Sequence, residues 1–343
     1  MANSSLQNAK AAKNDEFYTR FDDIQKELNY YRDQFKNKVV YCNCDDPGES
    51  EFCRFFQLNF DHFGLKKLIC THYTRSDLFN WLEDRRKGYV LEITGKDKVK
   101  KTFLTGNGDF RSPECVELLK QCDIVCTNPP FSLFREYIHQ LIYYKKKFLV
   151  IGNKNAIAYK EIFPLFQHNK IWIGYTAPDD FICLNGELSG KMKGLTKWWT
   201  NLDITKRHEK MILYEEYTAK KYPTYVNYPA IEVSKSTAIP KDYYGIMGVP
   251  ISFIDKFSPE QFEIIGLSLF DATEKPPNLP PALRGGPACY LLKNGQYKRL
   301  YNRIFIKRKD IQWRLHAKLS KSETFLTATK IKIGTASSGT VVS

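Results

Sequence analysis

Apolar residues follow two different periods along the first two hundred positions of this chain. After residue 19 an apolar residue recurs every three or four positions, which predicts a helix with one apolar face, capped by Thr19. The apolar residues of that face are Ile24, Leu28, Tyr31 and Phe35. Short continuous apolar runs, typical of buried strands, occupy residues 38–44, 67–73, 123–127 and 147–151.

Helical segments are predicted between these runs, at residues 49–63, at 113–121 and after Ser132, which is a candidate cap. Strands that alternate with amphipathic helices predict an α/β fold, an open parallel sheet with helices on both faces. In such sheets ligands bind at the carboxyl ends of the strands. The loops at 45–48, 106–110 and 128–131 all follow predicted strands, so we expect them to converge on one crevice.

The regular alternation is interrupted once and then fades. Residues 74–104 are charged and are interpreted as an insertion with short strands near 89–93 and 99–104. The predicted organisation is a mobile basic arm at 1–14, a main α/β domain at 15–210 that carries the insertion, a second region at 211–318, and a disordered tail at 319–343.

Charge and composition narrow the function classes. Lys plus Arg is 52 and Asp plus Glu is 38, a net charge of +14 that favours an anionic partner such as nucleic acid over a merely soluble basic surface. No apolar run is long enough to span a bilayer, and the first residues lack the apolar core of a signal peptide. The nine cysteines include no CxxC pair, so they are interpreted as buried free thiols of a cytosolic protein rather than ligands of a structural zinc site.

The most informative motif is Asn128-Pro129-Pro130-Phe131, directly after an apolar strand. An exocyclic aromatic amine is a poor nucleophile because its lone pair is delocalised into the ring. Two acceptors on its protons, the Asn128 side-chain oxygen and the Pro129 carbonyl, would bias the nitrogen toward tetrahedral geometry by positioning alone. The prolines stiffen the loop, and Phe131 offers a face for a flipped base. The alternatives are a Pro-rich turn and a core phenylalanine.

The natural electrophile for that geometry is the sulfonium methyl group of S-adenosylmethionine. When this methyl group is transferred, the rest of the cofactor is released as S-adenosylhomocysteine. No metal is required. Asp109 is placed to accept from the adenine amine of this cofactor, and Phe110 to pack on its ring, although 106–110 also fits an ordinary polar turn. Candidate residues beneath the methionine moiety are Asn43, Cys44, Asp45 and Asp46. The two acids could equally be an N-terminal pair favoured by a helix dipole.

Several sequence runs resemble the EcoRI-type family of adenine-specific DNA methyltransferases. They are residues 13–19 (KNDEFYT), 39–47 (VVYCNCDDP), 106–112 (GNGDFRS), 127–137 (TNPPFSLFREY), 170–174, 200–203, 245–251 and 257–263. The resemblance covers roughly residues 13–265. It implies a Rossmann-like methyltransferase fold, S-adenosylmethionine as cofactor, and methyl transfer to the 6-amino group of an adenine flipped out of double-stranded DNA. Residues 15–210 would then be the methyltransferase catalytic domain, and 211–318 the DNA-binding and target-recognition region.

The resemblance also implies roles for particular positions and partners. Phe17 and Tyr18 match an N-terminal cofactor-binding segment, and Trp198 and Trp199 lie where related enzymes make a second contact to the flipped base; two core tryptophans are the alternative. The sequence departs from the broad methyltransferase pattern in lacking a Gly-rich loop after the first strand and an acid for the ribose after the second. The implied setting is bacterial cytosol or nucleoid, in or derived from a restriction–modification system, with a cognate endonuclease encoded nearby and no need for a dimer.

Two other functions remain open at this point. The same loop would suit a methyltransferase that acts on RNA adenine or on a protein glutamine amide. A non-catalytic DNA-binding protein on a decayed scaffold is disfavoured because Asn128 to Phe131 and Asp109 are intact. Base-reading residues could lie at 74–104, at 175–200 or in the basic C-terminal part, where 298–314 carries interleaved aromatics.

Overall fold

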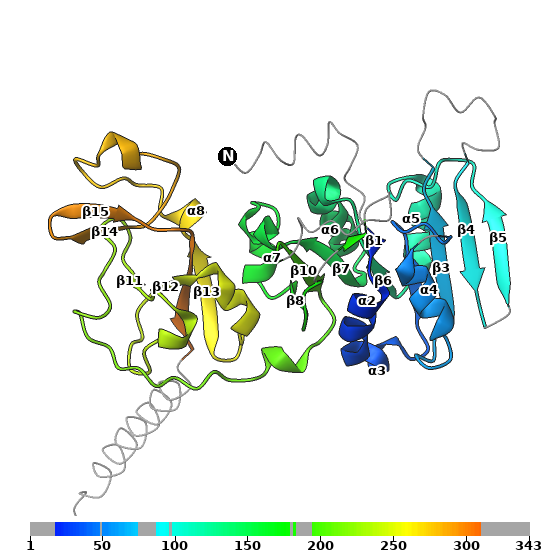
Figure 1. Cartoon of the computed structure of the whole chain (residues 1–343), viewed down its shortest axis with the longest axis horizontal. Coiled ribbons are helices and arrows are strands. Elements are labelled where there is room, and N and C mark those ends of the chain that lie inside the picture. Colours follow the sequence, from blue (N-terminus) through cyan, green and yellow to red (C-terminus); the bar gives the residue numbers. More distant parts are fainter. Residues whose placement is uncertain are drawn as a thin grey trace, which may run out of the picture. The chain divides into compact units, whose positions relative to one another are not determined.

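The computed structural model describes residues 18–48, 50–74, 87–95, 98–178, 181–182 and 194–309, which fall into two compact units that divide between His208 and Glu209 (Figure 1). The predicted arm at 1–14 and tail at 319–343 lie outside the described residues. No helix within those ranges is both long and apolar enough to cross a membrane.

The first unit is built on an eight-stranded mixed sheet in the order β5-β4-β3-β2-β6-β7-β10-β8. Its four central strands are mutually parallel: β3 (Lys67–His72), β2 (Val39–Cys42), β6 (Ile124–Thr127) and β7 (Lys147–Asn153). These strands confirm the prediction that the four apolar runs form buried strands. Because continuous apolar sequence suits strands buried on both faces, the runs located the centre of the sheet correctly.

The two edges of the sheet correct the expectation of an all-parallel sheet. On one side β4 (Tyr89–Ile93) pairs antiparallel with β3, and β5 (Val99–Phe103) pairs antiparallel with β4. On the other side β10 (Thr196–Thr200) runs antiparallel to both β7 and β8 (Trp172–Ile173). The short connection between β4 and β5 is too short for a parallel crossover, which needs a dozen or more residues. The described part of the expected insertion therefore extends the main sheet.

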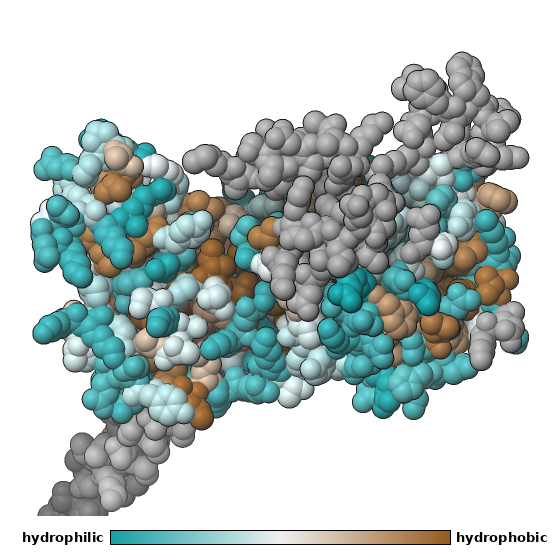
Figure 2. Space-filling view, viewed as in Figure 1, coloured by the Kyte–Doolittle hydropathy of each residue, from teal (hydrophilic) through white to brown (hydrophobic). Residues whose placement is uncertain are grey.

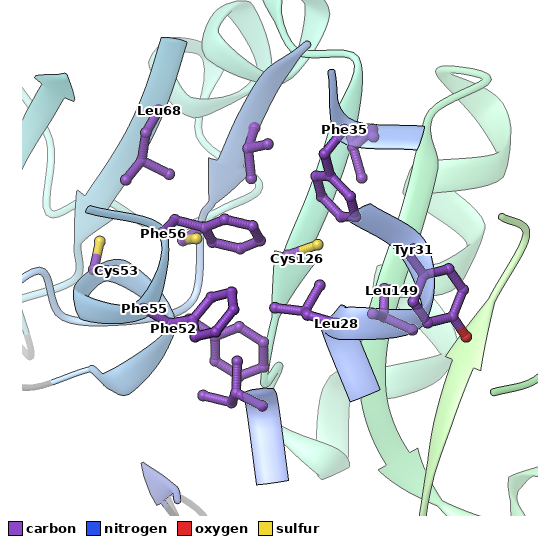
Figure 3. Close-up of a cluster of buried hydrophobic side chains, with 14 of the residues drawn as sticks. Leu28, Tyr31, Phe35, Phe52, Cys53, Phe55, Phe56, Leu68, Cys126 and Leu149 are labelled. Carbon is purple, nitrogen blue, oxygen red and sulfur yellow. The ribbon is translucent and has the colours of Figure 1, made fainter. Parts of the chain in front are cut away.

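Helices cover both faces of this sheet. On one face lie α2 (Phe21–Leu28), the 3-10 turn η1 (Asn29–Tyr31), α3 (Arg32–Phe35) and α4 (Glu51–Leu58). Their side chains, including Leu28, Phe35 and Phe56, form one apolar cluster with strand residues such as Cys126 (Figure 3). α5 (Pro113–Gln121) and α6 (Phe134–Tyr143) complete the layers, followed by η4 (Lys154–Ala158) and α7 (Phe163–Gln167).

Two expected helix caps are wrong. α2 begins at Phe21 with Arg20 at its N-cap and no side-chain capping bond. Thr19 instead belongs to the short strand β1 (Tyr18–Thr19), where it pairs with Phe181 of β9 (Phe181–Ile182). Ser132 lies inside the 3-10 turn η3 (Phe131–Leu133), so α6 begins only after it. Each helix begins one residue later than the expected cap would place it, because Thr19 is paired in β1 and Ser132 lies within η3.

The cysteines also differ from expectation at one place. Cys53 of α4 and Cys70 of β3 form a disulfide with a Cα–Cα distance of 6.4 Å, so the interpretation as free thiols is wrong for this pair. The sulfur of Cys42 lies within 4.8 Å of both. Because two of these three sulfurs are bonded to each other, the group does not present three thiolates to a metal ion.

The second unit contains a four-stranded sheet in the order β11-β12-β16-β13. Its strands are β11 (Ile231–Glu232), β12 (Met247–Pro250), β16 (Arg303–Arg308) and β13 (Phe262–Leu267). A separate hairpin joins β14 (Tyr290–Lys293) to β15 (Gln296–Arg299). The remaining elements are α8 (Ser268–Asp271) and the 3-10 turns η6 (Ser236–Ala238), η7 (Ile251–Lys256) and η8 (Pro281–Leu283); η5 (Thr205–Arg207) closes the first unit.

Candidate active site at the carboxyl edge of the sheet

Strand order marks the ends of β2 and β6 as the place where a ligand site is expected. From β2 the chain first adds strands on one side, β3 to β5, and then returns to add β6 and β7 on the other side. Such a reversal marks a topological switch point, where α/β sheets bind ligands outside the carboxyl ends of the strands. The loop after β2 (43–48) and the loop after β6 (128–131) both begin at that point.

Asp45 joins these two loops. Its carboxylate is buried and accepts a short hydrogen bond from the Thr127 hydroxyl and a longer one, 3.4 Å, from the backbone N–H of Asn128. The backbone N–H of Cys44 in turn donates to the Thr127 hydroxyl oxygen over 3.2 Å. Burial raises the pKa of Asp45 to about 6, although these hydrogen bonds act to lower it. The carboxylate therefore fixes the start of the Asn-Pro-Pro-Phe loop and still carries charge near neutral pH.

Tyr137 connects the loop after β2 to Phe110. Its hydroxyl donates to Asn43 Oδ1 over 2.5 Å, and its ring meets the Phe110 ring edge-on with centroids 5.1 Å apart. All three side chains are buried. Burial raises the pKa of the Tyr137 hydroxyl, so it stays a neutral donor. Sequence reasoning assigned Tyr137 no role, because its place on the apolar stripe of α6 looks like ordinary core packing.

Asp109 lies in the turn that follows β5. Since β5 is two antiparallel steps from β3, it runs parallel to β3 and delivers this turn to the same carboxyl edge. Arg111 binds both carboxylate oxygens of Asp109, Nε to Oδ1 over 2.9 Å and an Nη to Oδ2 over 2.7 Å. These bonds hold the pKa of Asp109 below its usual range. A carboxylate has about four acceptor sites, so Asp109 can still accept from a ligand.

A second unexpected group lies at the end of β3. His72 Nδ1 is 2.8 Å from Asp46 Oδ2, and the His72 ring stacks on Tyr89 with centroids 4.7 Å apart. Burial acts to raise the pKa of Asp46, but the bonds from His72 and from the Gly48 backbone outweigh it, so the pKa is lowered. Only one sign of this pair is present in the sequence, which is that β3 is not followed by the acid that usually binds the ribose of the cofactor. The structure brings Asp46 of the neighbouring loop to that position.

The remaining predicted residues lie in the loop after β6, in β1 or outside the described residues. Phe131 is 8% exposed and packs edge-on against Phe181 at 6.4 Å, so the core alternative describes its present surroundings. Pro129 is buried, and the Pro130 carbonyl accepts from the Leu133 backbone N–H over 3.0 Å. Tyr18 pairs with Ile182. Phe17 lies outside the described residues.

Trp198 and Trp199 are fully buried in β10. Trp198 packs against Phe52 and Trp199 against Phe134, with ring centroids 5.9 and 5.8 Å apart. Successive residues of a strand point to opposite faces of the sheet, so the two indoles serve different layers of the core. The alternative of two core tryptophans matches these positions.

Gly108 fixes the turn that carries Asp109. Its φ is +83°, and a Cβ added there would lie 2.2 Å from the His72 carbonyl oxygen. We therefore expect Gly108→Ala to lower the free energy of unfolding by at least about 1–2 kcal/mol. Urea unfolding followed by tryptophan fluorescence measures this change. Gly95→Ala is the matched control, because its added Cβ would make only ordinary contacts, and equal stability of the two variants would contradict the argument.

The sequence is similar to a family of known methyltransferases. The family model described as adenine-specific methyltransferase EcoRI matches residues 5–309. The type II methyltransferase M.EcoRI of Escherichia coli is 46% identical over 289 residues, which cover 77% of this chain and 89% of that protein. M.MgeORF184P of Mycoplasma genitalium is 39% identical over 329 residues (88% and 98%), and M.MpnI of Mycoplasma pneumoniae is 41% identical over 277 residues (75% and 83%). No solved structure matches the chain.

Proposed function

The chain belongs to the EcoRI family of adenine-specific methyltransferases, and from that premise we propose that it methylates the exocyclic 6-amino group of an adenine flipped out of double-stranded DNA. The methyl donor in this proposal is S-adenosylmethionine. The observation that carries the proposal is the switch point between β2 and β6, where the buried carboxylate of Asp45 holds the first residue of the Asn128–Phe131 loop. That arrangement supports a Rossmann-like methyltransferase fold.

The donor set at this edge fits the proposed cofactor. S-adenosylmethionine carries a sulfonium and an ammonium, and Asp45, Asp46 and Asp109 bring three carboxylates to the carboxyl edge. Asp45, with Asn43 and Cys44 beside it, would hold the methionine moiety. Asp109 would accept from the adenine amine. Asp46 with His72 takes the position of the missing ribose acid, which supports the same orientation. When bound, the cofactor supplies an electrophilic methyl group.

The protein's own part in the reaction is positional. The Asn128 side-chain oxygen and the Pro129 carbonyl would accept the two protons of the target amine, so that its lone pair points away from the ring plane. Asp45 and Thr127 hold the backbone that presents these acceptors. Phe131 would stack on the base only after the loop uncovers its ring. A strong base is not needed, since the nitrogen loses its proton after the methyl group has been transferred.

A labelled methyl donor tests this function directly. We expect incubation with duplex DNA to place label on the 6-amino group of adenine, whereas RNA and lysate protein stay unlabelled. Label in RNA adenine or in glutamine side chains would replace the substrate in this proposal. A cognate endonuclease encoded nearby and action as a monomer also belong to the proposal, and neither changes the expected product.

A further inference from the structure

The hairpin β14–β15 of the second unit has a tip of well-defined geometry. Asn294 and Gly295 connect its strands, and both have positive φ, 52° and 75°. Two consecutive positive φ values define the type I′ turn, which matches the right-handed twist of the strands. The hairpin is therefore a regular two-stranded ribbon up to its end, and the residues around the turn are exposed.

One face of this ribbon is braced by the Pro-rich loop before it. The register pairs Tyr290 with Arg299 and Leu292 with Tyr297, so these four residues share one face. The Tyr290 hydroxyl donates to the Leu283 carbonyl over 3.0 Å and the Tyr297 hydroxyl to the Pro277 carbonyl over 2.9 Å. Arg299 donates to the Gly286 carbonyl over 3.0 Å. These bonds hold the ribbon rigidly against its own loop.

The opposite face presents polar side chains to solvent. The residues that share it are Leu291, Lys293, Gln296 and Lys298. Leu291 packs against the apolar cluster around Phe305, which anchors the base of the ribbon. Lys293, Gln296 and Lys298 are exposed, and Figure 2 shows mostly hydrophilic surface over this hairpin. A rigid ribbon with two lysines and a glutamine on its exposed face offers positive charge and hydrogen-bonding groups to a polar, anionic partner.

The charge of the surrounding segment supports the same partner. From Lys275 to Lys309 the chain has nine lysines and arginines and no aspartate or glutamate. One of them, Arg303, is paired in the interior with Glu232. A stretch of this length without an acid gives a locally positive segment and minimises repulsion of phosphates.

We propose that the β14–β15 hairpin enters the major groove of duplex DNA and reads bases of the target site, an inference that rests on the proposed function. The major groove is about 12 Å wide and admits a two-stranded ribbon. Gln296 is the base-reading residue, because a glutamine amide can bond both N6 and N7 of adenine. Lys293 and Lys298 flank it on the same face and contact phosphates or guanine acceptors.

The test starts from the full-length protein and the modified site found by sequencing DNA from a host that lacks adenine methylation. Binding is measured to a duplex with that site and to a set of duplexes that each differ at one base pair. We expect Gln296→Ala to reduce discrimination at one position by roughly 5- to 150-fold and to leave the others unchanged. The double variant Lys293→Ala/Lys298→Ala should weaken binding to every duplex about equally and reduce the salt slope by about two.

The control is Lys220→Ala/Lys256→Ala, which removes two exposed lysines of the same unit outside this segment. If hairpin and control variants bind all duplexes like the wild type while the wild type still methylates DNA, the hairpin proposal is overturned and the proposed function stands. If the full-length protein bound single-stranded RNA more tightly than the duplex, the hairpin proposal would also be overturned. A wild-type protein that methylates no DNA would instead refute the proposed function. Cofactor binding and thermal melting of each variant confirm that it is folded.

Discussion

Replacing Asn128 with alanine should slow methyl transfer by about 100- to 1,000-fold, the range seen when one preorganised polar group is removed from a reacting centre. The side-chain oxygen is one of only two acceptors proposed to hold the target amine. The other, the Pro129 carbonyl, belongs to the backbone and survives the change. The loop itself should persist, because its contact to Asp45 runs through the Asn128 backbone N–H. Single-turnover kinetics with saturating DNA and cofactor measure the rate.

Two comparisons separate an acceptor role from a structural one. Asn128→Asp keeps a side-chain oxygen at the same position, so it should lose less rate than the alanine variant. The affinities of the alanine variant for duplex DNA and S-adenosylmethionine should stay near those of the wild type. An unchanged single-turnover rate in Asn128→Ala would remove the acceptor from the mechanism. An equal loss in both variants would indicate that the loop, rather than the oxygen, had been damaged.

The centre of the fold could be predicted because its signal is local. The four apolar runs became the parallel strands β2, β3, β6 and β7, since a strand buried on both faces must be apolar throughout. At one edge the short strands near 89–93 and 99–104 were predicted and are confirmed as β4 and β5, but they were assigned to an insertion rather than to the main sheet. β5 is exposed along its whole length and contains two lysines, so its sequence does not show that it pairs with a buried sheet. In the second unit β11 has only two residues, too few for any period to appear.

The site could be predicted only as far as strand ends define it. The loops at 45–48 and 128–131 were located because each follows a parallel strand, and the contact between Asp45 and Asn128 joins them. Asp46 was assigned to the methionine moiety, whereas its contact to His72 arises from the pairing of β2 with β3. Tyr137 acts through contacts to residues far away in sequence. Contacts between residues far apart in the chain leave no periodic pattern in the sequence, so they could not be predicted from it.

Asp45→Asn should make the protein more stable above about pH 6 and remove part of its pH dependence. The wild-type carboxyl has a pKa of about 6 in the folded state, raised mainly by burial, against about 3.9 when unfolded. Below about pH 4 it is protonated in both states and its burial is least unfavourable. As pH rises from about 4 to 6, the unfolded state ionises first, so stability falls by roughly 3 kcal/mol in total. Asparagine does not titrate, so this decline should vanish.

Denaturant unfolding of wild type and variant across pH 4 to 8 isolates this effect as the difference between two curves. Asp46→Asn is the matched control, because its pKa shift has the opposite sign. The pKa of Asp46 is lowered by His72, so Asp46 contributes stability above its unfolded pKa and loses it as pH falls through the folded value. Its asparagine variant should therefore be less stable near neutral pH. If the difference in free energy of unfolding between the wild type and Asp45→Asn stayed constant between pH 4 and 6, the raised pKa of Asp45 would be contradicted.

The stability that Asp45 gives up has a functional counterpart in the proposed site. A buried carboxylate is unfavourable in the free protein, but a cationic ligand beside it recovers that energy on binding. We therefore expect the affinity for S-adenosylmethionine to fall as pH drops below about 6 in the wild type, because the carboxyl must ionise for full attraction. Asp45→Asn should bind the cofactor weakly at all pH values, with this pH dependence lost, although the protein itself is more stable. Calorimetric titration at pH 5 and pH 8 measures both. If Asp45→Asn were more stable and still bound the cofactor as tightly as the wild type, the ammonium group of S-adenosylmethionine would not lie beside Asp45.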